Sequence, residues 1–363
     1  MTETAERLAA RCLTVGIEGL DARPEALDLV RRGVGGVILF ARNVDGPAQV
    51  AALSRSLKAA APGALIVSID QEGGRVQRLR APAWTELPPM RALGGLSEAD
   101  AEQAGALLSR ELSASGIDLD YAPVVDVDTN PANPVIADRS FSRDPERVAR
   151  LAVALGRALE AGGVASCVKH FPGHGDTAQD SHQTLPRLPH GLDRLRAVEL
   201  VPFVAAARAG LASVMTAHVV FEALEPLPAT LSPKAMRLLR DEVGFAGCCI
   251  SDDLEMKAIA ETVGVVEGAV QALTAGVDSL LVCHTPALQH ACIDALARRV
   301  PRSRLEEAAG RVARLQRFAR PASAIEPAAA AAACASAQHL AIARRLGAQA
   351  AARGADPTEW RTA

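Results

Sequence analysis

The sequence predicts an α/β fold: a single (β/α)8 TIM-type barrel with a C-terminal helical extension. Three observations lead to this expectation. The chain has 363 residues, enough for one large α/β domain or two small ones. Hydrophobic residues make up 49% of it, so a sizeable core can form. Roughly eight apolar, strand-like runs alternate with helical segments, which favours a closed barrel over an open doubly wound sheet.

The predicted strands are short apolar runs between helical segments. Val34–Phe40 illustrates the pattern, because its Val-Ile-Leu-Phe stretch lacks the polar alternation of a half-exposed strand. In chain order the predicted strands are Cys12–Ile17, Val34–Phe40, Ala64–Ile69, Leu119–Val127, Val164–Val168, Ser213–Val219, Gly247–Ile250 and Asp278–Val282.

Helices are expected between these strands. Pro24–Arg32 has helical spacing of its apolar residues, and Pro47–Ala60 is rich in Ala and Leu. Pro145–Ala161 carries the clearest boundaries. Asp144 can cap its N-terminus, and Gly162-Gly163 can stop it.

The C-terminal part of the chain differs in composition from about Ala322 onward. Ala328–Ala333 is pure alanine, and an Arg- and Ala-rich helix follows. We therefore predict a barrel over residues 1–320 and an Ala-rich helical extension over residues 321–363, whose polar end we expect to fray. The extension carries no motif.

Composition argues against several classes of partner. The net charge of −3 gives no reason to expect nucleic acid or an anionic membrane surface. Aromatic residues make up only 3%, which argues against an extended stacking platform for bases or long glycans. The N-terminus is polar and no run of about 18 apolar residues occurs, so we expect a cytoplasmic protein without a membrane span.

The cysteines are odd in number and form no Cys-x-x-Cys pair, which argues against a zinc ribbon. Free, buried thiols would suggest a reducing compartment. The seven cysteines are Cys12, Cys167, Cys248, Cys249, Cys283, Cys292 and Cys334.

Polar residues gather where the predicted strands end. In a (β/α)8 barrel the active site lies at the carboxyl ends of the strands, so these side chains should meet around one cavity. They are Asp70, Asp126, Lys169, His170, His218 and Asp252.

The run from Lys169 to Asp176 contains Pro and two Gly residues, and we expect it to form a loop. Asp180 and His182 follow it, and they form a candidate proton-transfer dyad, because a nearby carboxylate can orient an imidazole and tune its basicity. A solvated loop histidine is the simpler alternative. A metal site that also uses His174 and Asp176 is the rival, although the spacing matches no common zinc motif.

Asp252 follows the predicted strand Gly247–Ile250. A carboxylate at the end of a barrel strand can attack an electrophilic carbon as a nucleophile. The alternative is a helix N-cap, a position that Ser and Asp favour. Asp253 is the better candidate for such a cap or for a supporting role.

A second polar group begins at Asp70 and ends at Arg78, with Gly73-Gly74 between them. The glycines allow a sharp turn and a close approach to a ligand. The segment lacks the Gly-Lys-Ser/Thr of a phosphate loop, and a carboxylate with a guanidinium suits sugar hydroxyls. A surface turn with a local ion pair is equally compatible. Arg139 and Lys169 are further candidate donors, each with a structural alternative.

Four motifs in this order resemble the family 3 glycoside hydrolases, and within them the bacterial β-N-acetylglucosaminidases of peptidoglycan recycling. The resemblance covers about residues 10 to 320 and excludes the Ala-rich extension. The motifs are Asp70-Gln-Glu-Gly-Gly-Arg-Val-Gln-Arg78, Asp138-Arg-Ser-Phe141, Lys169-His-Phe-Pro-Gly-His-Gly-Asp176 with Asp180-Ser-His182, and Ser251-Asp-Asp-Leu254.

The resemblance implies a cytoplasmic enzyme with no metal and no cofactor. It implies removal of terminal β-linked N-acetylglucosamine from N-acetylglucosaminyl-anhydromuramyl peptides, a small-molecule substrate, and we expect a monomer. By the family pattern Asp252 is the nucleophile, His182 the acid/base and Asp180 its partner. The residues implied to hold the sugar are Asp70, Arg78, Arg139, Lys169 and His170.

Three alternatives remain open at this stage. Phosphate can replace water as the acceptor, because an imidazole tolerates an anion better than a carboxylate does, and the enzyme would then be a phosphorylase. A metal-dependent hydrolase can use His170, His174, Asp176 and His182. A non-catalytic sugar-binding barrel is the third alternative, and it is disfavoured by the presence of both catalytic candidates.

Overall fold

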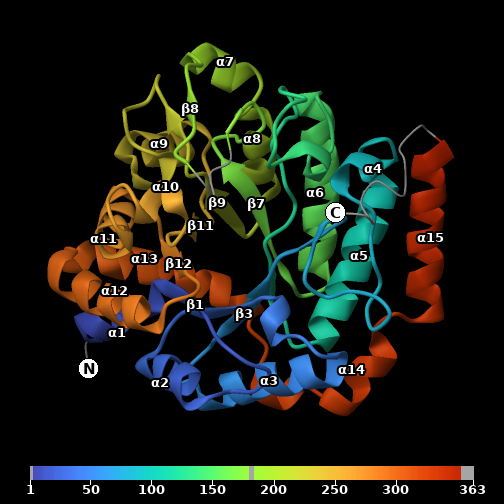
Figure 1. Cartoon of the computed structure of the whole chain (residues 1–363), viewed down its shortest axis with the longest axis horizontal. Coiled ribbons are helices and arrows are strands. Elements are labelled where there is room, and N and C mark those ends of the chain that lie inside the picture. Colours follow the sequence, from blue (N-terminus) through green and yellow to red (C-terminus); the bar gives the residue numbers. More distant parts are fainter. Residues whose placement is uncertain (1–2, 180–183, 353–363) are drawn as a thin grey trace.

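Eight parallel strands close into a barrel in a computed structural model that describes residues 3–179 and 184–352. Figure 1 shows these strands at the centre, with helices around them. Closure comes from β1, which pairs with β2 on one side and with β12 on the other. The barrel strands are β1 Leu13–Gly16, β2 Gly36–Leu39, β3 Ile66–Ile69, β6 Leu119–Asp120, β7 Ala165–Phe171, β9 Ser213–Thr216, β11 Cys248–Asp253 and β12 Ser279–Val282. The predicted fold class is confirmed, and each predicted strand overlaps one barrel strand.

The helices pack outside the barrel, and α2, α3 and α6 have the predicted bounds. In α6 the Asp144 side chain accepts a hydrogen bond from the Glu146 backbone N–H, and Gly162 ends the helix, both as predicted. No helix in the described ranges is both long and apolar enough to cross a bilayer. The helices are α1 Ala5–Arg11, α2 Pro24–Arg32, α3 Pro47–Ala60, α4 Met90–Gly94, α5 Glu98–Ala114, α6 Pro145–Ala161, α7 Leu192–Ala197, α8 Val201–Ala209, α9 Pro233–Arg237, α10 Lys257–Ala260, α11 Val265–Ala275, α12 Pro286–Arg299, α13 Arg302–Leu315, α14 Pro327–Ala333 and α15 Ala337–Ala352.

Strand alternation sends neighbouring side chains into two separate apolar clusters. Val37 and Leu39 belong to the large cluster between the strands and the helices. Ile38, between them, belongs to a smaller cluster with Ile66 and Met215 from other barrel strands, which fills the barrel interior. Burial on both faces explains why these strands read as continuous apolar runs.

Several predicted strand ends are wrong. Strand β9 ends at Thr216, three residues earlier than predicted, and β11 continues to Asp253, so that Asp252 lies within the strand. Strand β7 continues to Phe171, so Lys169 and His170 are strand residues and the loop begins after them. A buried lysine is compatible with this strand because Asp70 and another carboxylate neutralise it, as described below. Strand β6 is shorter than predicted and ends at Asp120. Pro123, which has no backbone N–H to donate, follows soon after.

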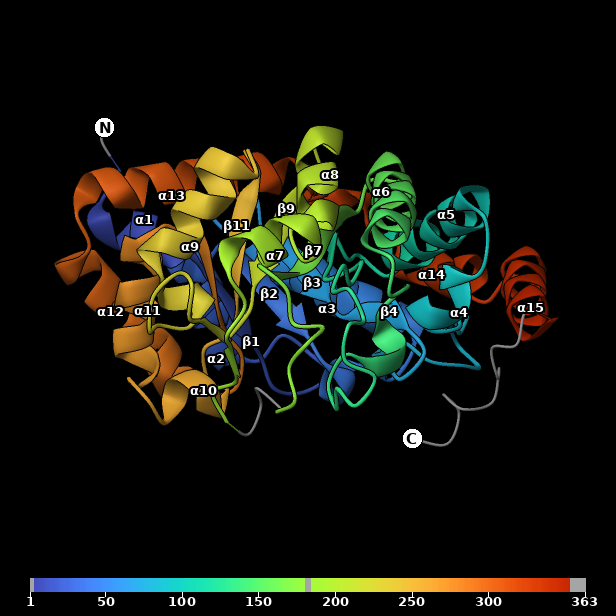
Figure 2. The ribbon, with the colours of Figure 1, turned by 90° about the horizontal axis from the view of Figure 1, so that it is seen from above.

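The C-terminal extension forms two helices, α14 and α15, where one was predicted. The break falls at residues 334–336, where Ala335 has a φ of 45°. Helix α14 packs against α3 and α5, and α15 packs against α4 and α5. Figure 2 shows α15 beside α4 and α5 at one end of the molecule. The predicted fraying of the chain end lies outside the described residues.

Among the described residues, two small two-stranded sheets lie outside the barrel. The hairpin β4 Gln71–Gly73 and β5 Val76–Gln77 follows β3 directly. A separate pair, β8 Arg187–Leu188 and β10 Val220–Phe221, links the segments after β7 and β9. Both pairs therefore arise from segments that follow barrel strands, and the hairpin carries part of the candidate site.

Candidate active site

A cavity of about 480 Å³ opens at the carboxyl ends of the barrel strands. Its volume lies within the roughly 300–1,000 Å³ that is usual for small-molecule sites. Strands β7 and β11, and the segments that follow β2, β3 and β12, contribute to its wall. Six residues predicted from the sequence line it: Asp70, Arg78, Arg139, Lys169, His170 and Asp252.

Two carboxylates and three cations form a continuous ion-pair network in this wall. Nζ of Lys169 lies 2.9 Å from Oδ1 of Asp70 and 2.6 Å from Oε1 of Glu72. The Arg139 guanidinium donates two hydrogen bonds of 2.8 Å to the two oxygens of Glu72. Arg78 donates to Asp70 at 3.1 Å. Bidentate geometry and burial fix these side chains in one arrangement.

The network keeps its members charged. Burial alone would raise the pKa of Glu72, but Arg139 and Lys169 outweigh it and lower the pKa to about 2. Burial would likewise raise the pKa of Asp70, but Lys169 and Arg78 hold it well below its usual range. Burial would lower the pKa of Lys169, but the two carboxylates raise it above its ordinary value. The cavity wall therefore presents fixed charges at neutral pH, which suit hydroxyl and amide groups of a sugar.

A buried carboxylate orients the two histidines of the site. Nδ1 of His170 lies 2.7 Å from Oδ2 of Asp126, and because a carboxylate accepts, Nδ1 carries the hydrogen. The Asp126 side chain also accepts from the backbone N–H of His174 at 2.7 Å. Burial lowers the pKa of His174 to about 4, so this ring is neutral near pH 7. Nδ1 of His174 lies 2.8 Å from the Thr177 hydroxyl.

Asp252 stands near the end of β11, at the cavity. The backbone N–H of Asp253 donates to its Oδ1 at 2.8 Å. Below it, the buried His218 donates from Nε2 to the Asp253 carbonyl oxygen at 2.9 Å, while its Nδ1 lies 2.7 Å from the Thr230 hydroxyl. Burial lowers the pKa of His218, so a neutral ring braces this strand end. The helix-cap alternative for Asp252 is wrong, because α10 begins at Lys257 without a side-chain cap.

An aromatic ring stands at the rim of the cavity. Phe40, which follows β2, has its ring centroid 5.5 Å from that of His284. The guanidinium carbon of Arg42 lies 4.6 Å from the Phe40 centroid, and that of Arg78 lies 5.7 Å from it. His284 is itself paired with Asp253 at 3.1 Å. The apolar face of a sugar ring can pack on such an aromatic surface.

Not every predicted residue is brought to the cavity. Asp180 and His182 lie outside the described residues, so their positions are not assigned. Asp176 contacts His190 at 2.6 Å and Thr129 at 2.9 Å and is absent from the cavity lining. Within the described part of the chain, no group of three or more His, Cys, Asp or Glu side chains is arranged to hold a metal ion.

Two acidic residues hold central positions without a role assigned to them from the sequence. Glu72 was not singled out, and Asp126 was expected at the cavity as a strand-end residue but does not line it. Glu72 links Lys169 to Arg139, and Asp126 orients His170. Both stood within patterns already noted. Glu72 is two residues from Asp70 and so can share its side of an extended segment, and Asp126 is a strand-end carboxylate. Their partners Arg139 and His170, 67 and 44 residues away along the chain, gave no local signal.

Comparison with known proteins gives one consistent result. The family model of the glycosyl hydrolase family 3 N-terminal domain matches residues 14–315. A β-hexosaminidase of Neisseria meningitidis serogroup C is 45% identical over 269 residues, which cover 72% of this chain and 74% of the relative.

Two solved structures agree closely. A family 3 β-N-acetylglucosaminidase from Paenibacillus sp. superposes with a TM-score of 0.89 at 38% identity and covers 96% of this chain and 69% of its own. NagZ from Neisseria gonorrhoeae, solved with N-trifluoroacetyl-D-glucosamine, gives a TM-score of 0.80 at 37% identity, with 93% of this chain and 97% of that chain covered.

Proposed function

The chain belongs to glycosyl hydrolase family 3 and is a glycoside hydrolase of the β-hexosaminidase type, and from this premise we propose that it is a retaining exo-β-N-acetylglucosaminidase. Its proposed substrates are (anhydro)muropeptides with a non-reducing terminal β-linked N-acetylglucosamine. We assign it to peptidoglycan recycling in the cytoplasm, in keeping with the motif resemblance set out above.

One observation carries the proposal. A carboxylate, Asp252, lines the same cavity as a fixed network of charged donors and acceptors that includes Asp70, Lys169 and Arg139. Ion pairs between side chains of this chain hold the network, so it is in place before a sugar binds. Such pre-organisation directs binding energy toward holding the sugar ring against the nucleophile.

The proposed reaction has two steps. Asp252 attacks the anomeric carbon, while His182 gives a proton to the departing oxygen, so that the glycosidic bond breaks as a glycosyl ester forms. His182, now neutral, then takes a proton from water, which attacks the same carbon and releases Asp252. Two inversions retain the anomeric configuration. An imidazole suits this exchange because its unperturbed pKa is about 6.5. Asp180 is the proposed partner of His182.

The first experiment measures hydrolysis of an aryl β-N-acetylglucosaminide by the purified chain, with the aryl β-glucoside as control. We expect rapid release from the N-acetyl substrate alone, unaffected by EDTA, with free N-acetylglucosamine as the product. Loss of activity in EDTA would support the metal-dependent alternative. A sugar 1-phosphate formed on addition of phosphate would support the phosphorylase. Binding of N-acetylglucosamine without turnover would mark a non-catalytic barrel.

Variants separate the two catalytic roles. Asp252→Ala should lower kcat by about 10³–10⁴-fold or more on every substrate, whereas Asp241→Ala, at an exposed position, should not. His182→Ala should lower turnover of poor leaving groups by about 10²–10⁴-fold and affect activated aryl groups much less. Equal losses on both substrate types would contradict the acid role of His182.

A further inference from the structure

A second cavity lies at the opposite end of the barrel from the hydrolytic site. It has a volume of about 220 Å³ and is bordered by the segments that enter β9 and β11, and by α13 with the short turn η5 Gln316–Phe318. Active sites of (β/α)8 barrels lie at the carboxyl ends of the strands, so this cavity at their amino ends is a separate feature. It is smaller than the roughly 300–1,000 Å³ of ordinary ligand pockets, which limits it to a small molecule.

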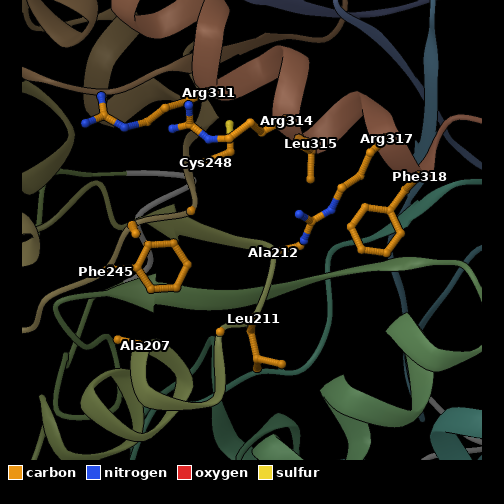
Figure 3. Close-up of a pocket in the computed structure, with 13 residues that line it drawn as sticks. Ala207, Leu211, Ala212, Phe245, Cys248, Arg311, Arg314, Leu315, Arg317 and Phe318 are labelled. Carbon is orange, nitrogen blue, oxygen red and sulfur yellow. The ribbon is translucent and has the colours of Figure 1, made fainter.

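Three arginines stand along one side of this cavity. Figure 3 shows Arg311, Arg314 and Arg317 on the side of α13 and η5, with Phe245 and Leu211 across from them. Their spacing of three residues places them on neighbouring turns of one helix and its continuation. We call the cavity, with these arginines and the apolar side chains of Phe245 and Phe318, the arginine pocket.

The arginines differ in their partners. Arg311 is neutralised, since it lies 2.6 Å from Glu307 and 3.2 Å from Asp278. Arg314 and Arg317 are exposed, and neither donates a hydrogen bond or forms an ion pair within residues 3–179 and 184–352. Arg317 rests on the Phe318 ring, with 5.3 Å between its guanidinium carbon and the ring centroid. Two guanidinium groups therefore keep their hydrogen-bond donors available.

The lining arginines and the charged groups linked to them carry an excess of positive charge. Arg304 and Arg240 also converge here, on Asp278, which three arginines share. Glu160 is the acid that interacts with Arg317, and burial raises the pKa of this acid. Among these linked groups, five arginines meet three carboxylates, an excess of two positive charges in a chain whose net charge is −3. The arginines are Arg240, Arg304, Arg311, Arg314 and Arg317, and the acids are Asp278, Glu307 and Glu160.

We propose that the arginine pocket binds the dianionic phosphate group of a small molecule, either inorganic phosphate or a phosphomonoester with a compact apolar body. Arg314 and Arg317 supply guanidinium donors that match phosphate oxygens in geometry. Two negative charges on the ligand balance the local excess. Phe245 and Phe318 provide a wall for an apolar substituent.

The test is isothermal titration of the purified chain with phenyl phosphate, inorganic phosphate and benzoate, the last as a monoanion with the same ring. We expect phenyl phosphate to bind most tightly and benzoate least. Tightest binding by inorganic phosphate would identify the free ion as the ligand. Arg314→Gln/Arg317→Gln should weaken binding of phenyl phosphate by at least about tenfold. The matched control, Arg55→Gln on α3, also changes an exposed arginine and should bind as the unaltered chain does.

Hydrolysis of the aryl N-acetylglucosaminide locates the bound phosphate. Phenyl phosphate at the arginine pocket should leave KM unchanged, because the pocket lies at the far end of the barrel. Competitive inhibition that persists in the double variant would place the ligand in the hydrolytic cavity and overturn the proposal. Equal binding by the double variant and the Arg55→Gln control, or no binding of either phosphate, would overturn it as well.

Discussion

Lys169 occupies a position that few lysines occupy: its side chain is 2% exposed, and it neutralises two acids at once. Its replacement leaves Asp70 and Glu72 with one compensating cation each. Removing one partner of a buried ion pair is costly, because the remaining charge has lost both water and its counter-charge. The residue therefore serves the stability of the cavity wall as well as any contact with a sugar.

Lys169→Met should lower the free energy of unfolding by about 3–5 kcal/mol. The difference in unfolding free energy between the variant and the unaltered chain should shrink as the pH falls from 4.5 toward about 2. These are the ordinary pKa of Glu72 and its pKa in the folded chain. This sign follows because a depressed carboxyl pKa contributes stability above the unfolded pKa, and that stability is lost on acidification. Urea unfolding between pH 2 and 7 measures this difference in unfolding free energy, with Lys257→Met, at an exposed position, as the control. A loss no greater than that of the control would contradict the network.

Asp120 presents the opposite case at the residue scale. Its Oδ1 accepts from the Gln71 backbone N–H, while its Oδ2 has no hydrogen-bond partner within the described chain. Burial raises its pKa well above the ordinary value. A group with a raised pKa supplies stability below its unfolded pKa, and this is lost as pH rises. The ionised form of Asp120 therefore lowers the stability of the folded chain near neutral pH.

Asp120→Asn should remove this pH dependence. At pH 7 the variant should be at least as stable as the unaltered chain, and its advantage should decline toward pH 4, near the ordinary pKa of 3.8. Each pH unit contributes at most about 1.4 kcal/mol to the slope. Chemical unfolding at several pH values gives the comparison. If the stability of the variant relative to the unaltered chain is lower at pH 7 than at pH 4, the raised pKa of Asp120 is refuted.

At the scale of elements, two carboxylates of α5 attach the C-terminal extension to that helix: Asp100, which pairs with Arg345 of α15 at 2.7 Å, and Glu111. The Glu111 side chain of α5 accepts from the Thr85 N–H and hydroxyl and from the Ala335 N–H, and its Oε1 lies 2.8 Å from Nδ1 of His339 in α15. All four contacts are buried or partly buried. The alanine-rich extension is therefore held by specific polar bonds in addition to its apolar contacts.

His339→Ala should loosen α15 and lower the free energy of unfolding by about 1.5–3 kcal/mol, the usual range for a hydrogen bond to a charged group. Hydrogen exchange of the α15 amides should speed up, whereas turnover should be unchanged, because no residue of α15 lines the hydrolytic cavity. Leu340→Ala, which removes an exposed neighbour, is the control. Unaltered exchange in His339→Ala would show that the other contacts of α15, among them the Arg345–Asp100 ion pair, hold the helix without His339.

Across the whole molecule, all seven cysteines are free and buried. Burial raises the pKa of Cys12, Cys167 and Cys249 to about 12, so few thiolates exist near neutrality to react. The native chain should label with DTNB only as fast as it opens, and all seven thiols should react in denaturant. Rapid labelling of the native chain at pH 8 would contradict this closed packing.

The sequence by itself determined the positions of the eight strands and the bounds of α2, α3 and α6, because apolar periodicity, caps and glycine stops act over a few residues. It also indicated six residues of the hydrolytic cavity. Four of them stand at strand ends, which converge in a parallel barrel, and Arg78 and Arg139 came from the motifs of the family resemblance. Local chemistry was less informative at Lys169, where Pro and Gly further on suggested a loop and the structure has a strand.

Only the tertiary structure decided which charges meet. The pairing of Lys169 with Asp70 joins residues 99 apart, and that of His339 with Glu111 joins residues 228 apart. Barrel closure and helix docking bring such groups together, and their pKa values depend on burial that no local pattern encodes. For the same reason the extension's two docked helices and the arginine pocket emerged only from the packed chain, since both arise where distant segments share a surface.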